Sequence, residues 1–263
     1  MPMLALALLQ ASPAAALNCT VASSERRVPL LELYTSEGCD SCPPTDRWLS
    51  ALPGRGFGSE HVVALAFHVD YWDYIGWRDH FAQKRFTERQ RQIAARSGSR
   101  VVYTPQLVLN GRDYRRGSFR DDFAQRIADI HVQKPRAALK LAVQPAGDTL
   151  VVSGHAVLTD AAGQPLAQTW LALYENRLAT EVKAGENRGK RLEHDFVVRD
   201  IVGPLAVDAR GASIEHRFRL GSQWKPRDLG VAAFVQDIRN GDVLQALDCA
   251  AGQNELGAGS KPR

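Results

Sequence analysis

The first half of the chain alternates continuous apolar runs with segments of helical periodicity. Residues 29–35 and 61–68 are apolar almost throughout, which predicts two buried strands of a parallel sheet that is covered on both faces. A helix between them, which begins near the Cys-x-x-Cys sequence at 39–42, completes a crossover unit. Apolar residues spaced by three and four predict two more helices, one over 78–96 and one that is capped by Ser118 and runs to about residue 130.

The second half is dominated by short strands. The pattern changes near residue 135, which predicts an α/β thioredoxin-like domain over 17–134 and a mainly-β, sandwich-like domain over 135–250. Residues 251–263 are expected to form a flexible tail. Within the β domain, residues 214–220 alternate apolar and charged side chains, as a half-buried strand does. Six segments have strand character and are separated by turn signals: 138–143, 150–158, 169–174, 192–198, 214–220 and 231–235.

Residues 1–16 have the pattern of a secretory signal peptide. An apolar run over 3–9 precedes small residues that end in Ala14-Ala15-Ala16, the A-x-A type of sequence that signal peptidase cleaves. The run is far shorter than the ~20 apolar residues that a membrane-spanning helix needs, and no later run approaches that length. We therefore expect a periplasmic or secreted protein with no transmembrane segment in the mature chain. A short hydrophobic anchor is the alternative.

The composition adds only a few exclusions. With 44% hydrophobic and 24% charged residues, the 263-residue chain is an ordinary globular protein and not a disordered or fibrous one. A net charge of +4 is weak for this length, which disfavours nucleic acid as a partner. The basic residues of the 78–96 helix are expected to form a solvated face. They include Lys84, Arg85, Arg89, Arg91 and Arg96.

Four cysteines carry most of the chemical information. Cys39 and Cys42 are three positions apart, whereas Cys19 and Cys249 lie near the two ends of the mature chain. Four cysteines allow three connectivities, and this spacing favours the pairs Cys39–Cys42 and Cys19–Cys249 in a compartment where disulfides persist. The terminal pair would then be a structural disulfide. The alternative is that Cys19 and Cys249 remain free thiols.

The position of the Cys-x-x-Cys sequence predicts redox chemistry. A C-x-x-C at the junction of a buried strand and a helix, followed by a parallel crossover, is the thioredoxin-like arrangement. At the helix N-terminus the dipole would stabilise a thiolate on Cys39, and Cys42 would then resolve a mixed disulfide. The negative charge of Asp40 disfavours a thiolate on the neighbouring Cys39. A stable thiolate is what makes a dithiol a strong oxidant, so we expect a reducing or intermediate reduction potential. Structural zinc is disfavoured because no second ligand pair follows.

A proline later in the chain supports the same architecture. Thr104-Pro105 precedes an apolar strand at 106–109 and the hairpin signal Asn110-Gly111. In thioredoxin-like folds a cis-proline precedes a central strand and faces the dithiol. We therefore expect Pro105 to be cis and to present backbone to the substrate, with Thr104 beside it.

Three sequence blocks carry a family resemblance. The block LYTSEGCDSCPP at 33–44, the block at 68–77 that begins HVDYWD, and YTPQ at 103–106 resemble a family of predicted secreted bacterial proteins classed as a domain of unknown function. The likeness covers most of the mature chain. It implies a thioredoxin-like fold but supplies no settled substrate. The Thr before the proline also resembles periplasmic disulfide isomerases.

Other side chains near the dithiol have two interpretations each. Glu32 lies mid-strand among leucines, where it either serves the second cysteine as a buried base, with its pKa raised by burial, or reaches water at a strand edge. Tyr71 and Trp72 follow the second strand, at the end of a parallel sheet where functional loops gather. With Tyr74 and Trp77 they either form a substrate-contacting wall or simply cover the end of the sheet.

The leading hypothesis is an exported thiol–disulfide oxidoreductase that acts on protein or small-molecule disulfides. Cys39 would attack, Cys42 would resolve, and no cofactor is needed. The partners would be a disulfide- or thiol-containing protein substrate and a redox-recycling partner. Two alternatives remain. One is a periplasmic copper-binding protein or metallochaperone that uses both cysteines and His68, because thiolate and imidazole suit copper. The other is a redox-inactive interaction protein whose β domain binds the partner.

Overall fold

A computed structural model describes residues 17–159, 166–208 and 210–251, so the predicted signal peptide and almost all of the predicted tail lie outside the described residues. The protein is mixed α/β and mostly β, with three sheets and few helices. Over the described part of the chain, no helix has the length and apolar character needed to cross a membrane.

The helices are α1 (Pro43–Ser50), α2 (Lys84–Arg96) and α3 (Phe123–His131), with 3-10 helices η1 (Pro53–Arg55), η2 (Asp70–Ile75), η3 (Gly117–Phe119) and η4 (Pro226–Asp228). The strands are β1 (Cys19–Ala22), β2 (Leu30–Thr35), β3 (Val63–His68), β4 (Gln106–Leu109), β5 (Arg112–Asp113), β6 (Ala137–Ala146), β7 (Thr149–Leu158), β8 (Ala167–Glu175), β9 (Leu178–Glu181), β10 (Arg191–His194), β11 (Val197–Val207), β12 (Ala212–Arg219), β13 (Leu229–Asp237) and β14 (Val243–Ala250).

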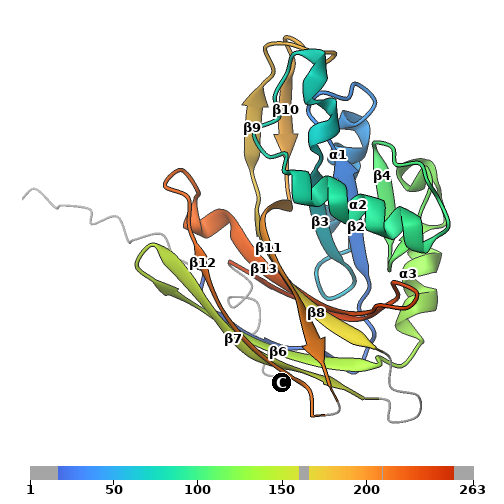
Figure 1. Ribbon diagram of the computed structural model, residues 1–263, viewed down its shortest axis with the longest axis vertical. Helices are drawn as coiled ribbons and strands as arrows, with labels where there is room; N and C mark the ends of the chain where they lie inside the picture. Colours follow the sequence, from blue (N-terminus) through green and yellow to red (C-terminus); the bar gives the residue numbers. More distant parts are fainter. Residues whose placement is uncertain (1–16, 160–165, 209, 252–263) are drawn as a thin grey trace, which may run out of the picture.

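The largest sheet has eight strands in the order β14-β13-β8-β11-β3-β2-β4-β5 (Figure 1). Strands β2 and β3 are parallel, and β4 runs antiparallel to β2. Strand β2 is apolar on both faces because both are covered. Leu31 and Leu33 pack in one cluster with α1 and α3, whereas Leu30 and Tyr34 pack in another with α2. The predicted buried strands at 29–35 and 61–68 are thus confirmed as β2 and β3.

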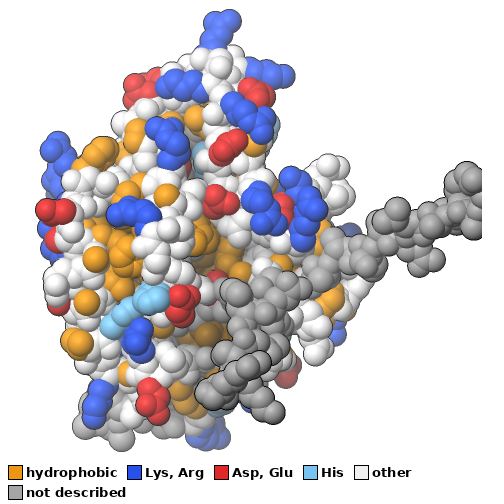
Figure 2. Space-filling model, turned by 180° about the vertical axis from the view of Figure 1, so that it is seen from behind, with side chains coloured by type: hydrophobic (Ala, Val, Ile, Leu, Met, Phe, Trp, Pro, Cys, Tyr) orange, Lys and Arg blue, Asp and Glu red, His pale blue; other side chains and the backbone are white. Residues whose placement is uncertain are grey.

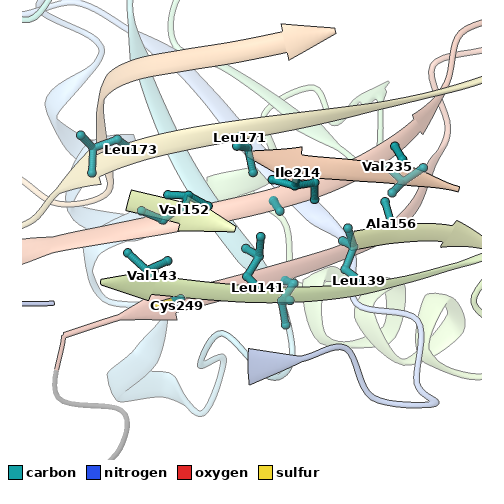
Figure 3. Close-up of a cluster of buried hydrophobic side chains, with 14 of the residues drawn as sticks. Leu139, Leu141, Val143, Val152, Ala156, Leu171, Leu173, Ile214, Val235 and Cys249 are labelled. Carbon is teal, nitrogen blue, oxygen red and sulfur yellow. The ribbon is translucent and has the colours of Figure 1, made fainter. Parts of the chain in front are cut away.

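A second sheet, in the order β1-β6-β7-β12, packs against the β8, β13 and β14 part of the large sheet (Figure 3). Alternate residues of β6, such as Leu139 and Leu141, share a core with Leu171 of β8 and Val235 of β13. Burying these alternate side chains supplies the main driving force for packing the two sheets. Figure 2 shows charged side chains of both signs interspersed with hydrophobic side chains on one face of the molecule.

Three element predictions need correction. Arg89 is buried and not solvated, because it lies on the side of α2 that faces the sheet with Phe86 and Ile93. The strand predicted over 192–198 is interrupted, since Phe196 has a φ of 59°, which separates β10 from β11. Ser118 lies in the 3-10 helix η3, and α3 begins four residues after η3 ends, at Phe123.

Backbone hydrogen bonds cross the boundary that was predicted near residue 135. Strand β11 pairs in parallel with β3 through Val197 and Ala66, and β1 pairs with β6 through Cys19 and Val143. The two-domain division stays a prediction. The large sheet nevertheless joins strands from both halves, so the two halves share one continuous backbone network.

A disulfide joins Cys19 to Cys249 and ties β1 to β14. The Cα atoms are 6.3 Å apart, and the cysteines are separated by 230 positions in the sequence. Both sulfur-bearing residues are buried in the core between the two sheets. Closing so long a loop restricts the unfolded chain strongly, which stabilises the folded state.

Replacing both Cys19 and Cys249 with alanine is expected to lower the free energy of unfolding by about 2–4 kcal/mol. The reason is the larger conformational entropy of the unfolded chain without the cross-link. Urea unfolding followed by circular dichroism measures the difference, with the wild type under non-reducing conditions as the control. An unchanged unfolding midpoint would show that this pair does not stabilise the chain.

Candidate functional site

The Cys39–Cys42 disulfide lies at the junction between β2 and α1. The two Cα atoms are 5.5 Å apart, which confirms the predicted pairing. Helix α1 begins at Pro43, with Cys42 as its N-cap residue. Two prolines in the first turn account for this start, because their fixed φ suits a helix and their missing N–H groups cost nothing there. Cys39 therefore precedes the helix and is not at its N-terminus as predicted, so the helix dipole acts more directly on Cys42.

The loop between β9 and β10 is bonded to the backbone around this disulfide. We call residues 182–190 the cap loop. The side chain of Asn187 is fully buried and donates two hydrogen bonds from Nδ2, to the carbonyl oxygens of Glu37 at 2.8 Å and Cys39 at 2.9 Å. Oε2 of Glu186 accepts a hydrogen bond from the N–H of Asp40 at 3.1 Å. Figure 1 shows β9 and β10 beside the end of the molecule that carries α1 and β3. Both cysteines of the disulfide are completely buried.

A glycine allows the cap loop to approach closely. Gly185 has a φ of +71°, a backbone conformation that glycine adopts freely. A Cβ atom at this position would lie 3.1 Å from Cδ1 of Ile75 and 3.2 Å from Cβ of Trp77. The sequence shows a turn signal at 187–189 but does not show where the turn docks, because its contacts lie about 150 positions earlier in the chain.

Replacing Asn187 with alanine removes two hydrogen bonds and is expected to speed reduction of the Cys39–Cys42 disulfide by dithiothreitol about 30-fold. Each lost hydrogen bond is worth about 1 kcal/mol, so the open state of the cap loop becomes more populated. Alkylation of the freed thiols at timed intervals, followed by mass spectrometry, measures the rate. Asn240→Ala, in the turn between β13 and β14, is the matched control and should react like the wild type. Equal rates for all three proteins would show that Asn187 does not hold the loop closed.

Five ionisable side chains form a buried cluster near the disulfide: Glu37, Asp46, His68, Asp79 and His194. Nδ1 of His68 lies 2.7 Å from Oδ2 of Asp79. Nε2 of His194 lies 3.4 Å from Oε1 of Glu37. The two imidazole rings have centroids 5.0 Å apart, which makes the cluster continuous from β3 to β10.

Burial and mutual attraction set the charges in this cluster. Burial lowers the pKa of His68, but the acidic groups around it, chiefly Asp79 and then Asp46 and Glu37, together raise the pKa of His68 overall. Burial raises the pKa of Asp79, yet the attraction and hydrogen bond of His68 bring it below its usual value. Burial also raises the pKa of Asp46, and His194 and His68 oppose that rise only in part. His68 and Asp79 thus form an ion pair, whereas Asp46 holds a proton more readily than an exposed aspartate.

Asp46 is placed by α1 on the same side as the second cysteine. Its N–H donates to the carbonyl oxygen of Cys42 at 3.1 Å, so the two residues are one helical turn apart. Helical side chains tilt toward the N-terminus, which directs the carboxyl group of Asp46 back toward Cys42. Oδ2 of Asp46 also accepts a hydrogen bond from Oγ1 of Thr35 at 3.2 Å. Sequence reasoning missed Asp46 because a single aspartate in a short helix resembles an ordinary solvated residue.

Glu32 lies on the opposite face of β2 from Thr35. Its Oε1 accepts hydrogen bonds from Nε of Arg89 at 2.7 Å and from the hydroxyl of Tyr34 at 3.1 Å. These contacts make Glu32 the partner of a buried arginine. Asp46, and not Glu32, is therefore the carboxyl group on the side of the sheet that carries α1.

The loop that precedes β4 and contains Thr104 and Pro105 is also close to the disulfide. The Thr104–Pro105 peptide bond is cis, and Oγ1 of Thr104 accepts a hydrogen bond from Nε1 of Trp72 at 2.7 Å. Thr104 and Pro105 line a pocket of about 340 Å³ that also includes Ser41. Oγ of Ser41 lies 3.4 Å from Sγ of Cys39, so this pocket is adjacent to the disulfide.

The aromatic residues that follow β3 have separate environments. Nε1 of Trp77 donates to Oε2 of Glu37 at 2.9 Å, and the hydroxyl-bearing ring of Tyr71 is partly buried. Tyr74 is 81% exposed and its ring stacks on that of Trp72, with centroids 6.4 Å apart. Trp72 and Trp77 thus support the loops around the disulfide, and Tyr74 faces solvent.

His68 does not meet the cysteines as part of a metal-ligand set. Its Nδ1 is engaged by Asp79. Among residues 17–159, 166–208 and 210–251, no group of three or more His, Cys, Asp and Glu side chains is arranged to hold a metal ion.

The fold and site together define a mostly-β α/β protein with a disulfide of the Cys-x-x-Cys type beneath a loop from its β-rich half. The chain belongs to the family described as "Protein of unknown function (DUF1223)", whose model matches residues 30–236. This confirms the resemblance to a domain of unknown function.

Two solved structures share this architecture. One is a crystal structure of a protein from Agrobacterium tumefaciens, at 27% identity and a TM-score of 0.62, covering 91% of this chain and 100% of that one. The other is HBP35 of Porphyromonas gingivalis, at 16% identity and a TM-score of 0.67, covering 92% of this chain and 80% of that one. The second likeness concerns the fold alone. No curated protein matches the chain.

Proposed function

We propose that the protein is an exported thiol–disulfide oxidoreductase whose first half is a thioredoxin-like domain. The main observation that supports this proposal is the position of the Cys39–Cys42 disulfide, at the start of α1 and next to the loop that contains Pro105. The order β3-β2-β4-β5, with α1 and α3 on one face and α2 on the other, supports the thioredoxin-like interpretation. The two disulfides are typical of an oxidising compartment and support a periplasmic or secreted location.

The exchange proceeds through a mixed disulfide. A substrate thiolate attacks Sγ of Cys39, the Cys39–Cys42 bond breaks, and the electron pair leaves on the sulfur of Cys42. The carboxyl group of Asp46 supplies a proton to that sulfur, because burial keeps its pKa raised. A second substrate thiolate then attacks the substrate sulfur of the mixed disulfide and releases Cys39 as a thiolate. The substrate becomes a disulfide and the protein a dithiol; the reverse sequence reduces a substrate disulfide.

Access to Cys39 requires the cap loop to move. The hydrogen bonds of Asn187 and Glu186 fix that loop on the backbone of residues 37–40. A substrate that displaces these bonds gains access to the sulfur, whereas a substrate that cannot displace them is excluded. The cap loop thus makes the protein selective for substrates that can displace it. The rate of exchange with small disulfides that do not bind the loop is correspondingly low.

Turnover of a protein disulfide tests this proposal. Purified wild-type protein, without its first 16 residues, is added to insulin and dithiothreitol, and precipitation of the freed insulin chains is followed by turbidity. We expect precipitation to begin earlier than without the protein, in proportion to the protein concentration. If neither insulin reduction nor oxidation of a reduced, denatured protein is accelerated, the enzymatic function is wrong and the interaction-protein alternative gains support.

A further inference from the structure

We propose that the pocket beside Pro105 binds the carboxylate of a substrate thiol or disulfide, through Arg115 and Arg116. This inference rests on the proposed function and names the substrate class of that site. The pocket measures about 340 Å³ and is lined by both arginines together with Tyr103, Thr104 and Ser41. That volume suits a group as small as one or two amino acid residues.

The charge of the pocket is unbalanced. Two arginine residues, both exposed, line it, and no acidic residue does. Within the described residues, neither Arg115 nor Arg116 forms an ion pair, whereas Arg120 and Arg126 in the same segment both pair with Asp122. A guanidinium without a carboxylate partner is a strong binder of anions, and it binds a carboxylate through two parallel hydrogen bonds.

Asp113, the acidic residue nearest to the pair in the sequence, is bonded to other groups. Oδ1 of Asp113 accepts hydrogen bonds from the hydroxyl of Tyr103 at 2.7 Å and from Nε2 of Gln106 at 3.2 Å. The guanidinium carbon of Arg115 lies 5.7 Å from the centre of the Tyr103 ring. Tyr103 thus contacts Asp113 through its hydroxyl group and Arg115 through a cation–π contact of its ring.

The pocket is also close to the reactive sulfur, although Cys39 itself is buried and does not line it. Oγ of Ser41 lies 3.4 Å from Sγ of Cys39, and Ser41 lines the pocket itself. Oγ1 of Thr45 and Oγ of Ser118 are 3.0 Å apart at the pocket lining and add hydroxyl groups for an anion. A ligand whose carboxylate binds the arginines is therefore placed with its sulfur on the Ser41 side of the pocket, and it reaches Cys39 when the cap loop moves. The carboxylate could belong to a small thiol or to an acidic residue that flanks a cysteine in a protein.

Binding of S-methylglutathione to the oxidised protein tests the site without requiring any redox step. This probe is a small peptide with two carboxylates and no free thiol, and calorimetric titration measures its affinity. We expect binding to the wild type, at least 10-fold weaker binding to the Arg115→Gln, Arg116→Gln double variant, and no binding of the diethyl ester of the probe. Arg210→Gln with Arg219→Gln removes the same charge from exposed positions next to and on β12, and should bind like the wild type.

A second arm identifies the source of the carboxylate. An S-methylated Glu-Cys-Glu peptide is titrated in the same way, beside its Gln-Cys-Gln counterpart. Preference for the acidic peptide, lost in the Arg115 and Arg116 double variant, assigns the site to protein substrates; preference for S-methylglutathione assigns it to small thiols. If neither probe binds the wild type at millimolar concentration, or if the double variant binds them equally well, the inference is wrong. If the protein binds the probe but shows no disulfide turnover, the proposed function is wrong and the carboxylate site stands.

Discussion

Replacing Cys39 with serine is expected to abolish catalysed disulfide turnover completely. Cys39 forms the mixed disulfide, and a serine hydroxyl cannot take its place in thiol exchange. Cys42→Ser is expected to lose turnover as well, because in insulin reduction the thiolate of Cys42 resolves the mixed disulfide between Cys39 and insulin. The insulin assay measures both variants, and we expect each to match the reaction without protein.

The double Cys19→Ala, Cys249→Ala variant is the matched control for this prediction. It removes the other disulfide, so it should be less stable but should retain turnover per folded molecule. Circular dichroism shows whether each variant is folded at the assay temperature. Turnover by folded Cys39→Ser at the wild-type rate would contradict a role of this cysteine in exchange.

Asp46→Asn is expected to slow turnover about 100-fold, within the range that general acid–base catalysis contributes. The asparagine keeps the shape of the side chain but cannot hold or release a proton at Cys42. The pH profile of the wild-type turnover rate should therefore contain a titration above the ordinary range of aspartate, because burial raises the pKa of Asp46. That component should be missing from the pH profile of the variant.

The same variant should be more stable at neutral pH. The pKa of Asp46 in the folded state is higher than its value of 3.8 in the unfolded chain, so the folded state binds the proton more tightly. Above pH 3.8 the unfolded state ionises first, and stability falls until the folded-state pKa is passed. Asp46→Asn removes this loss. A slower and more stable variant supports a functional carboxyl group, whereas unchanged turnover would show that Asp46 is not part of the exchange.

The pattern of apolar residues was sufficient to predict the strands and helices nearest the disulfide. Strands β2 and β3 are apolar almost throughout, with Glu32 as the exception in the middle of β2, and such runs have few alternatives to a covered parallel sheet. The interruption at Phe196 could not be predicted, since a positive φ at a phenylalanine follows from tertiary packing and not from local preference.

The site was harder to predict than the sheet for physical reasons. The side of β2 on which Glu32 lies depends on strand register, and a shift of one residue exchanges the two faces. The buried position of Asp46 depends on what packs over α1. The cap loop depends on contacts between Asn187 and residues 37–39, about 150 positions apart. Such contacts leave no local pattern in a single sequence.

The central claim is that Cys39 exchanges disulfides with a substrate, and capture by Cys42→Ser tests it most directly. The tagged variant is expressed with its own export signal, free thiols are blocked with N-ethylmaleimide, and covalent complexes are isolated under denaturing, non-reducing conditions. The account predicts covalent complexes in which exported proteins are linked to Cys39 and which dissociate when the disulfide is reduced. These complexes should be absent from a Cys39→Ser, Cys42→Ser double variant. A Cys42→Ser variant that is folded and exported but forms no mixed disulfide through Cys39 would contradict it.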